Sequence, residues 1–129
     1  MAEVVAPPIE DIPDAAVLWR RIPSKPGWIV PVGDAGDRRP SSGAFEDDQD
    51  GSSMSMYLEG HGNEVADVLR DHESYGLVAL TAGQLRELGL TIVSQPEPGF
   101  PSHVEVEGNK THGLRSKLAK RCRWVVLPP

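Results

Sequence analysis

The sequence predicts an α+β fold: a mixed, mostly antiparallel sheet of five to seven short strands with about three packed helices. Short apolar or alternating runs, which are typical of strands, recur along the chain between turns that contain glycine and proline. Three other segments carry apolar residues at helical spacing. The chain has 129 residues and 39% apolar content, enough for one modest core. We therefore expect an extended N-terminal arm at 1–16 and a single domain at 17–129.

The first half of the chain predicts an arm followed by three strands. Residues 1–16 hold prolines among acids and show no regular period, which favours an extended conformation. Pro31 lacks an amide donor, so the second strand is expected at a sheet edge. Residues 33–53 are polar and predict a long loop. The three strands are expected at 17–22, 28–32 and 54–58.

The second half of the chain predicts three helices and four strands. Asn63, Thr81 and Thr111 can each cap a helix, and Gly89 ends the second helix. The third helix is expected to reach about Cys122. The strands are expected at 75–80, 91–95, 103–107 and 123–127. In the last but one of these, HVEVE, the valines face the core and the histidine and glutamates face outward.

Charge is divided unevenly along the chain. Residues 1–107 hold all nineteen Asp and Glu against seven Lys and Arg, a net charge of −12. Residues 108–129 hold six Lys and Arg and no acid, a net charge of +6. No apolar run approaches the roughly 18 residues that cross a bilayer, and the N-terminus does not read as a signal peptide. With a single cysteine, Cys122, the chain is expected in the cytoplasm and away from membranes.

The basic segment 107–124 predicts a helix with two faces. Leu114, Leu118 and Cys122 recur every four residues and face inward. A helix N-terminus offers unpaired N–H donors and a partial positive charge, so an anion or a protein partner is expected there and on the outer face. A solvated basic face and pairing with the chain's own acidic loop at 46–50 are the other two interpretations. The residues assigned to this binding surface are Lys110, Thr111, Arg115, Lys117, Lys120 and Arg121.

Motifs for metals and cofactors are missing or incomplete. The acidic run that starts at Glu46 imitates an EF-hand loop, but Tyr57 stands where a bidentate carboxylate is required. The four histidines lack zinc-ligand spacing, so no metal site is expected. His103, which follows a proline-rich loop, is the histidine best placed for catalysis, although a lone loop histidine is more often structural. The glycine patterns of nucleotide-binding loops are absent, and no cofactor is expected.

Two resemblances add to this picture. RPSSGAF at 39–45 and the closing KT…LA…W pattern, together with LWRRI and MSMYL, resemble small bacterial proteins of unknown function. This resemblance implies a bacterial origin and brings no activity with it.

The second resemblance concerns residue order. An arginine strand, a serine segment and a later glutamate pair are similar to the order in ADP-ribosyltransferase-like domains, which use NAD. The resemblance implies that an arginine holds the phosphates, a serine lines the nicotinamide pocket and a glutamate stabilises the cationic ribose. Surface arginines and turn-forming serines are the structural alternative. The residues concerned are Arg20 or Arg21, Ser41 or Ser42, and Glu105 or Glu107.

The function expected from the sequence is a non-catalytic binding or adaptor module of a bacterial cytosolic assembly. It would dock a protein partner through the basic C-terminal helix and the acidic loop. The alternative is a small NAD-using ADP-ribosyltransferase-like enzyme. Broad binding to duplex nucleic acid is not expected, because the −12 charge of the rest of the chain would repel the phosphate backbone.

Overall fold

The computed structural model describes residues 6–24, 27–32, 37–47 and 53–128. Over these residues the chain forms three α-helices and eight strands, which confirms the α+β fold with one strand more than expected. The elements are β1 (Val17–Ile22), β2 (Ile29–Val32), β3 (Asp37–Pro40), the 3-10 helix η1 (Ser42–Phe45), β4 (Ser53–Leu58), α1 (Val65–Val68), β5 (Gly76–Thr81), α2 (Ala82–Glu87), β6 (Thr91–Ser94), β7 (His103–Glu107), α3 (His112–Arg121) and β8 (Arg123–Val126).

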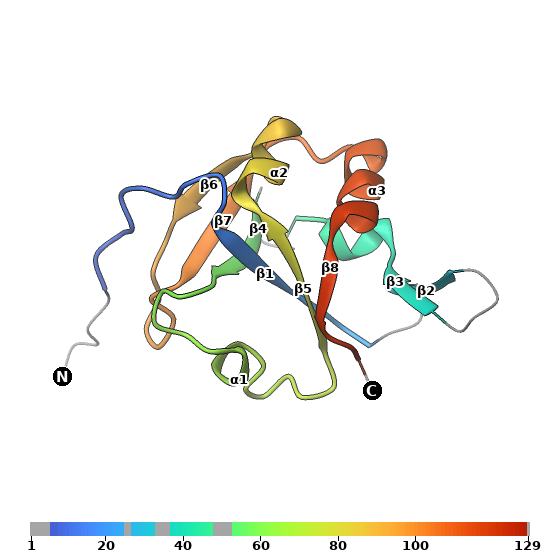
Figure 1. Ribbon diagram of the computed structural model, residues 1–129, viewed down its shortest axis with the longest axis horizontal. Coiled ribbons are helices and arrows are strands. Elements are labelled where there is room, and N and C mark those ends of the chain that lie inside the picture. Colours follow the sequence, from blue (N-terminus) through green and yellow to red (C-terminus); the bar gives the residue numbers. More distant parts are fainter. Residues whose placement is uncertain (1–5, 25–26, 33–36, 48–52, 129) are drawn as a thin grey trace.

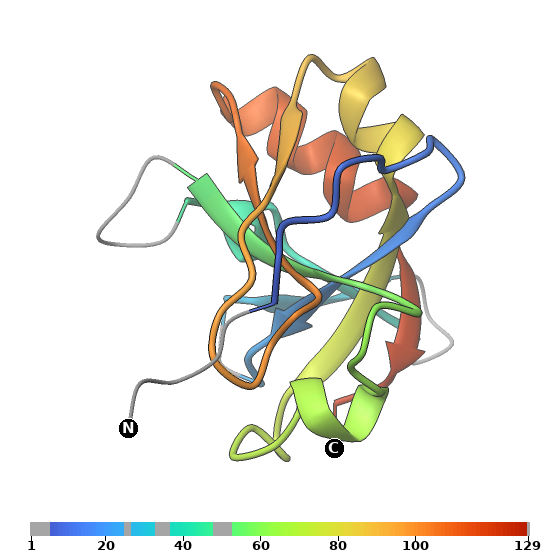
Figure 2. The same cartoon turned by 90° about the vertical axis from the view of Figure 1, so that its left-hand side faces the viewer.

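Six strands form the main sheet in the order β6-β7-β4-β1-β5-β8, and β2 and β3 form a separate two-stranded sheet. Every strand pairing in the described residues is antiparallel. Helices α2 and α3 lie on one side of the main sheet and α1 on the other (Figures 1 and 2). The β2–β3 hairpin projects beside α3 and β8 (Figure 1).

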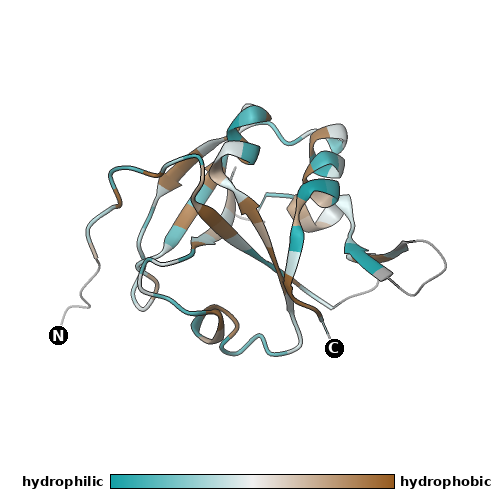
Figure 3. Ribbon diagram, in the orientation of Figure 1, coloured by the Kyte–Doolittle hydropathy of each residue, from teal (hydrophilic) through white to brown (hydrophobic). Residues whose placement is uncertain are grey.

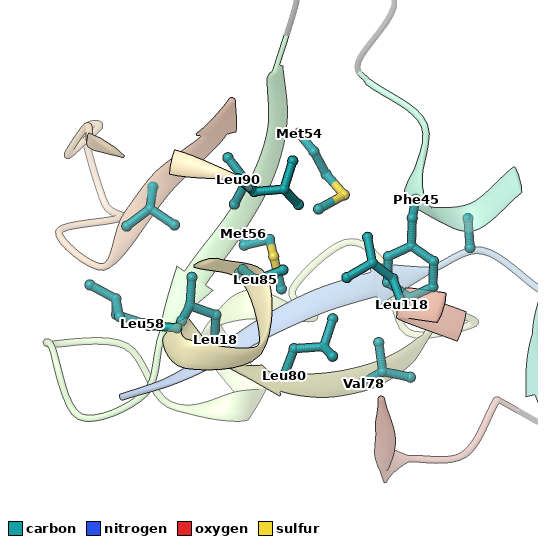
Figure 4. Packing of buried hydrophobic residues seen from close by; sticks show 14 of the residues in the cluster. Leu18, Phe45, Met54, Met56, Leu58, Val78, Leu80, Leu85, Leu90 and Leu118 are labelled. Carbon is teal, nitrogen blue, oxygen red and sulfur yellow. The ribbon is translucent and has the colours of Figure 1, made fainter. Parts of the chain in front are cut away.

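The main core lies between the sheet and the layer made by α2, α3 and η1 (Figure 4). Alternation along β4 directs Met54, Met56 and Leu58 into this core. Phe45 of η1 and Leu118 of α3 are both fully buried in this core, so η1 helps to hold α3 against the sheet. Full burial of side chains of this size contributes roughly 2–3 kcal/mol each, so this packing anchors the basic helix.

The opposite face of the sheet carries a smaller core under α1. Trp19, Tyr57 and Leu77 pack there with Val68 of α1. Helix α1 is a single turn of four residues, and a different residue from the expected one caps it. Its N-cap is Glu64, whose backbone N–H donates to the Asp67 carboxylate at 2.8 Å. The expectation that Asn63 caps this helix is wrong, because the buried Asn63 side chain bonds the 99–102 loop instead.

The other two helices begin and end where the sequence places them. The Thr81 side chain accepts from Gln84 N at 3.1 Å and caps α2. Gly89 follows that helix at a φ of 82°, a conformation that glycine adopts without the steric cost of a side chain. The Thr111 side chain accepts from Leu114 N at 3.2 Å and caps α3.

One segment differs from the expectation, and the arm packs against the domain. The polar stretch 33–53 contributes β3, η1 and the first residue of β4 rather than only a loop. In the arm, Ile12 is buried and Ile9 N donates to the Ser94 hydroxyl at 2.8 Å, so this part of the arm lies against β6. Residues 1–5 of the arm and residues 48–50 of the acidic loop lie outside the described residues.

Candidate functional site

The start of the basic helix is paired with the chain's own acidic loop. The Lys110 ammonium contacts the Asp47 carboxylate, and the Lys110 side chain is 2% exposed. Arg115 pairs with Glu46 at 3.0 Å and also donates to Lys110 O. The anion seat expected at this helix N-terminus is therefore occupied by Glu46 and Asp47. This is the internal pairing that the sequence left open.

The remaining residues of the expected binding surface divide into two groups. Thr111 acts as the helix cap, and Arg121 pairs with Glu87 of α2 at 3.4 Å. Lys117 and Lys120 are exposed on α3 and form no ion pair with a carboxylate of the described residues. Of the expected surface, these two lysines therefore carry ammonium groups that no carboxylate of the described residues neutralises.

Lys120 belongs to a second basic surface that sequence reasoning did not assemble. Two adjoining hollows of about 380 and 300 Å³ run between β3 and the C-terminal half of α3, and they share Arg39, Pro40, Ala119 and Lys120. We call them together the cationic groove. No carboxylate of the described residues lines either hollow. Its basic lining residues are Arg38, Arg39, Lys120 and Arg123, with His112 at the far end.

The walls of the cationic groove are held together by hydrogen bonds between distant segments. Trp124 Nε1 donates to Arg38 O at 2.8 Å, which ties β8 to β3. Arg38 donates to Pro128 O at 2.9 Å. Hydrophilic residues of β3, the end of α3 and the start of β8 lie near one another (Figure 3). Cys122 also lines the groove, and burial raises the pKa of its thiol to about 11.

The two serines that the NAD-dependent alternative requires lie in the cationic groove, whereas the two arginines that it requires lie in another pocket. Ser41 and Ser42 line the groove between β3 and η1. Arg20 and Arg21 line a different pocket of about 360 Å³. Glu107 is exposed at the end of β7 and lines none of these hollows. The NAD-dependent activity stays a prediction, with its serines separated from its arginines.

Arg20 has an architectural role. The buried guanidinium donates to Ala44 O at 3.1 Å, Ser55 O at 2.9 Å and Glu46 O at 3.3 Å. These three carbonyl groups belong to η1, to the residue that follows it and to β4, so Arg20 joins the 3-10 helix to the sheet. Arg21 points to the other side, where it donates to the Tyr57 hydroxyl at 2.9 Å and lies 3.0 Å from His72 Nδ1.

His103 lies in a polar cluster on the outer face of β4 and β7. It faces away from the main core as expected, but its side chain is 2% exposed, so the expectation that it is exposed is wrong. Its Nδ1 lies 2.6 Å from Gln95 O, and its Nε2 lies 3.2 Å from Ser55 Oγ. The Glu105 carboxylate accepts from Ser55 at 3.2 Å and from Ser53 at 2.9 Å.

Ser55 is the residue that sequence reasoning missed. The alternation in SMSMYL places Ser53, Ser55 and Tyr57 on the face opposite the core, and the alternation in HVEVE does the same for His103 and Glu105. Each alternation is visible in the sequence. Their meeting depends on the pairing of β4 with β7, which puts Ser55 opposite Glu105 and Tyr57 opposite His103.

Across the described ranges, no group of three or more His, Cys, Asp and Glu is arranged to hold a metal ion. The acidic run expected to imitate a calcium loop lies mostly outside these ranges. None of the helices in the described part of the chain has the length and apolar character needed to cross a bilayer. No protein-family model, curated protein or solved structure matches this chain.

Proposed function

We propose that this protein is a binding module that docks an acidic segment of a partner protein in the cationic groove. One observation carries the proposal: four permanent cations line a groove without a carboxylate of the described residues, in a chain whose net charge is −6. In such a chain, cations are usually interspersed with acids. A concentrated positive groove steers an anionic partner toward one place on an otherwise repelling surface.

The state of the cations favours binding from outside. Lys120 and Arg123 are exposed and form no ion pair within the described residues, so a partner carboxylate breaks no internal pair when it binds them. Lys110 and Arg115 differ in this respect, because each already contacts a carboxylate. We therefore place the proposed docking surface at the C-terminal half of α3 and not at its start.

The shape and chemistry of the groove favour a peptide. Arg38 and Arg39 can each form two parallel hydrogen bonds to one carboxylate, a geometry that lysine does not offer. Pro40, Ala119 and Trp124 supply apolar surface between the cations. An acidic segment with apolar side chains between its carboxylates would match this alternation. A cytoplasmic location belongs to the same proposal, and the free thiol of Cys122 supports it.

Fluorescence anisotropy with a short fluorescein-labelled peptide of alternating glutamate and leucine tests this function. Arg39→Glu and Lys120→Glu should each weaken binding by about tenfold or more, because each places a like charge against the peptide. Lys117→Glu is the matched control: Lys117 lies on the same helix, is exposed and does not line the groove. It should change the Kd by less than about twofold at physiological ionic strength.

Equal weakening by Lys117→Glu would show that only net charge matters and would refute the groove. Absence of binding to the wild-type protein would refute it as well. Tight binding of a single-stranded oligonucleotide in place of the peptide would assign the groove to a different class of partner.

A further inference from the structure

The polar cluster on the outer face of β4 and β7 has the geometry of an activated hydroxyl. We propose that Ser55 is a nucleophile for which His103 is the general base, and that the protein transfers acyl groups from small esters that carry a negative charge. This activity goes beyond the proposed binding function. It uses a different pocket and none of the groove's residues.

The tautomer of His103 follows from its contact with the backbone. Gln95 O can only accept, and it lies 2.6 Å from Nδ1, so Nδ1 carries a hydrogen. In the neutral ring Nε2 then has a lone pair, and this atom lies 3.2 Å from Ser55 Oγ. A nucleophilic serine requires a hydroxyl within hydrogen-bond reach of one imidazole nitrogen. It also requires a hydrogen-bond acceptor that holds the other nitrogen of the same ring.

Two carboxylates stabilise the charge that proton transfer creates. Glu105 Oε1 lies 3.4 Å from His103 Nε2, and Glu97 Oε1 lies 3.6 Å from His103 Nδ1. When Nε2 takes the Ser55 proton, the ring becomes a cation between these two anions. Glu105 also accepts from Ser55 Oγ at 3.2 Å, so the hydroxyl can turn toward Glu105 or toward His103, and attack proceeds from the rotamer that faces His103.

A pocket gives a substrate access to Ser55. Ser55 lines the hollow of about 360 Å³ together with Arg20 and Arg21, and no carboxylate of the described residues lines it. Trp28 and Tyr75 supply aromatic surface in the same pocket. Because Arg20 already donates to three backbone carbonyls, Arg21 is the cation of this pocket proposed to hold an anionic group of the substrate and to stabilise the oxyanion that forms on attack. The expected substrate is therefore a small ester with a carboxylate or phosphate group.

The reaction balances with water as the second reactant. Ser55 Oγ attacks the carbonyl carbon, and its proton passes to His103 Nε2. The ester C–O bond then breaks, and the leaving alkoxide takes that proton, which leaves an acyl-serine. Water attacks the acyl-serine, His103 takes one proton from the water, and that proton returns to Ser55 Oγ as the carboxylic acid leaves; the acid then releases the other proton to solvent and becomes the carboxylate. No electrons are exchanged.

A fluorophosphonate probe tests the nucleophile directly, because attack forms a Ser55 Oγ–P bond and releases fluoride. Intact mass and peptide mapping should place one adduct on Ser55. Ser55→Ala should abolish the adduct, and His103→Gln should slow labelling by about a hundredfold or more. Ser116→Ala is the control: Ser116 is a partly exposed serine of α3 and lies outside this polar cluster. It should label within about threefold of the wild-type rate.

Circular dichroism distinguishes loss of the base from loss of the fold in His103→Gln. If that variant does not fold, Glu105→Gln provides the same test, with labelling slowed by about tenfold because one carboxylate beside the imidazolium is removed. A wild-type protein without an adduct on Ser55, or unchanged labelling in a folded His103→Gln protein, would overturn the proposal.

Discussion

Replacement of Asp47 by asparagine probes the link between the acidic loop and the basic helix. The Lys110 side chain is 2% exposed, and its ammonium contacts the Asp47 carboxylate and Gly108 O. Asp47→Asn keeps the shape and removes the negative charge. The lysine is then buried with only neutral acceptors from these two residues. Breaking a buried pair in this way costs about 3 kcal/mol.

The neighbouring pair gives an internal scale for this cost. Arg115 is 18% and Glu46 63% exposed, so water replaces the lost carboxylate in Glu46→Gln. An exposed pair contributes about 0.5 kcal/mol, so the two isosteric changes, one residue apart, should differ about sixfold in their effect on unfolding free energy.

Urea unfolding followed by tryptophan fluorescence measures both effects. With an m-value of about 1.5 kcal/mol/M, Asp47→Asn should lower the midpoint by about 2 M and Glu46→Gln by about 0.3 M. Lys110→Met combined with Asp47→Asn should recover part of the loss, because no unpaired buried charge remains. Equal effects of the two single changes would refute the argument that burial sets the strength of these pairs.

Two further predictions concern glycine substitutions and the thiol. A Cβ at Gly113 of α3 meets open space, so Gly113→Ala should stabilise by about 1 kcal/mol and raise Tm by about 3 °C. A Cβ at Gly76 would lie 2.7 Å from Trp124 Cζ3 and 2.9 Å from Pro128 Cδ, so Gly76→Ala should destabilise the fold by about 2 kcal/mol. Calorimetric Tm shifts of the same sign in the two glycine variants would contradict these two predictions. Burial raises the pKa of Cys122 from 9.0 to about 11, so the folded state holds this proton more tightly than the unfolded chain. The stability that results is fully present below about pH 9 and is lost as the pH rises through about 11. The loss is at most about 3 kcal/mol. Cys122→Ala should remove this part of the pH dependence of the unfolding free energy measured in urea.

Local signals predicted those parts of the fold in which each residue's environment depends on nearby sequence. The Thr81 and Thr111 caps, the glycine stop at Gly89 and the alternation in β7 are all encoded within a few residues. Strand β3 was missed because Asp37, Arg38 and Arg39 are polar, and their strand conformation comes from pairing with β2 rather than from an apolar pattern.

The candidate sites were harder to predict, because each is assembled by tertiary contacts. The cations of α3 read as one continuous face, yet their states differ. Lys110 is neutralised by a residue 63 positions away, whereas Lys120 joins arginines of β3. The order of residues in the chain placed Ser41 and Ser42 in one site with Arg20 or Arg21, but in the structure these serines and arginines line different pockets. Ser55 lies next to His103 because two strands far apart in sequence pair.

Arg20 gives the two proposed sites a shared mechanical support. β1 pairs with β5 along its whole length, but with β4 it pairs at Leu18 and Trp19, and the Arg20 side chain then bonds Ser55 O directly. The same guanidinium donates a hydrogen bond to η1, which follows β3, the strand that forms one wall of the groove. Loss of this guanidinium would therefore leave a carbonyl oxygen of η1 and the carbonyl oxygen of Ser55 without this donor at the same time.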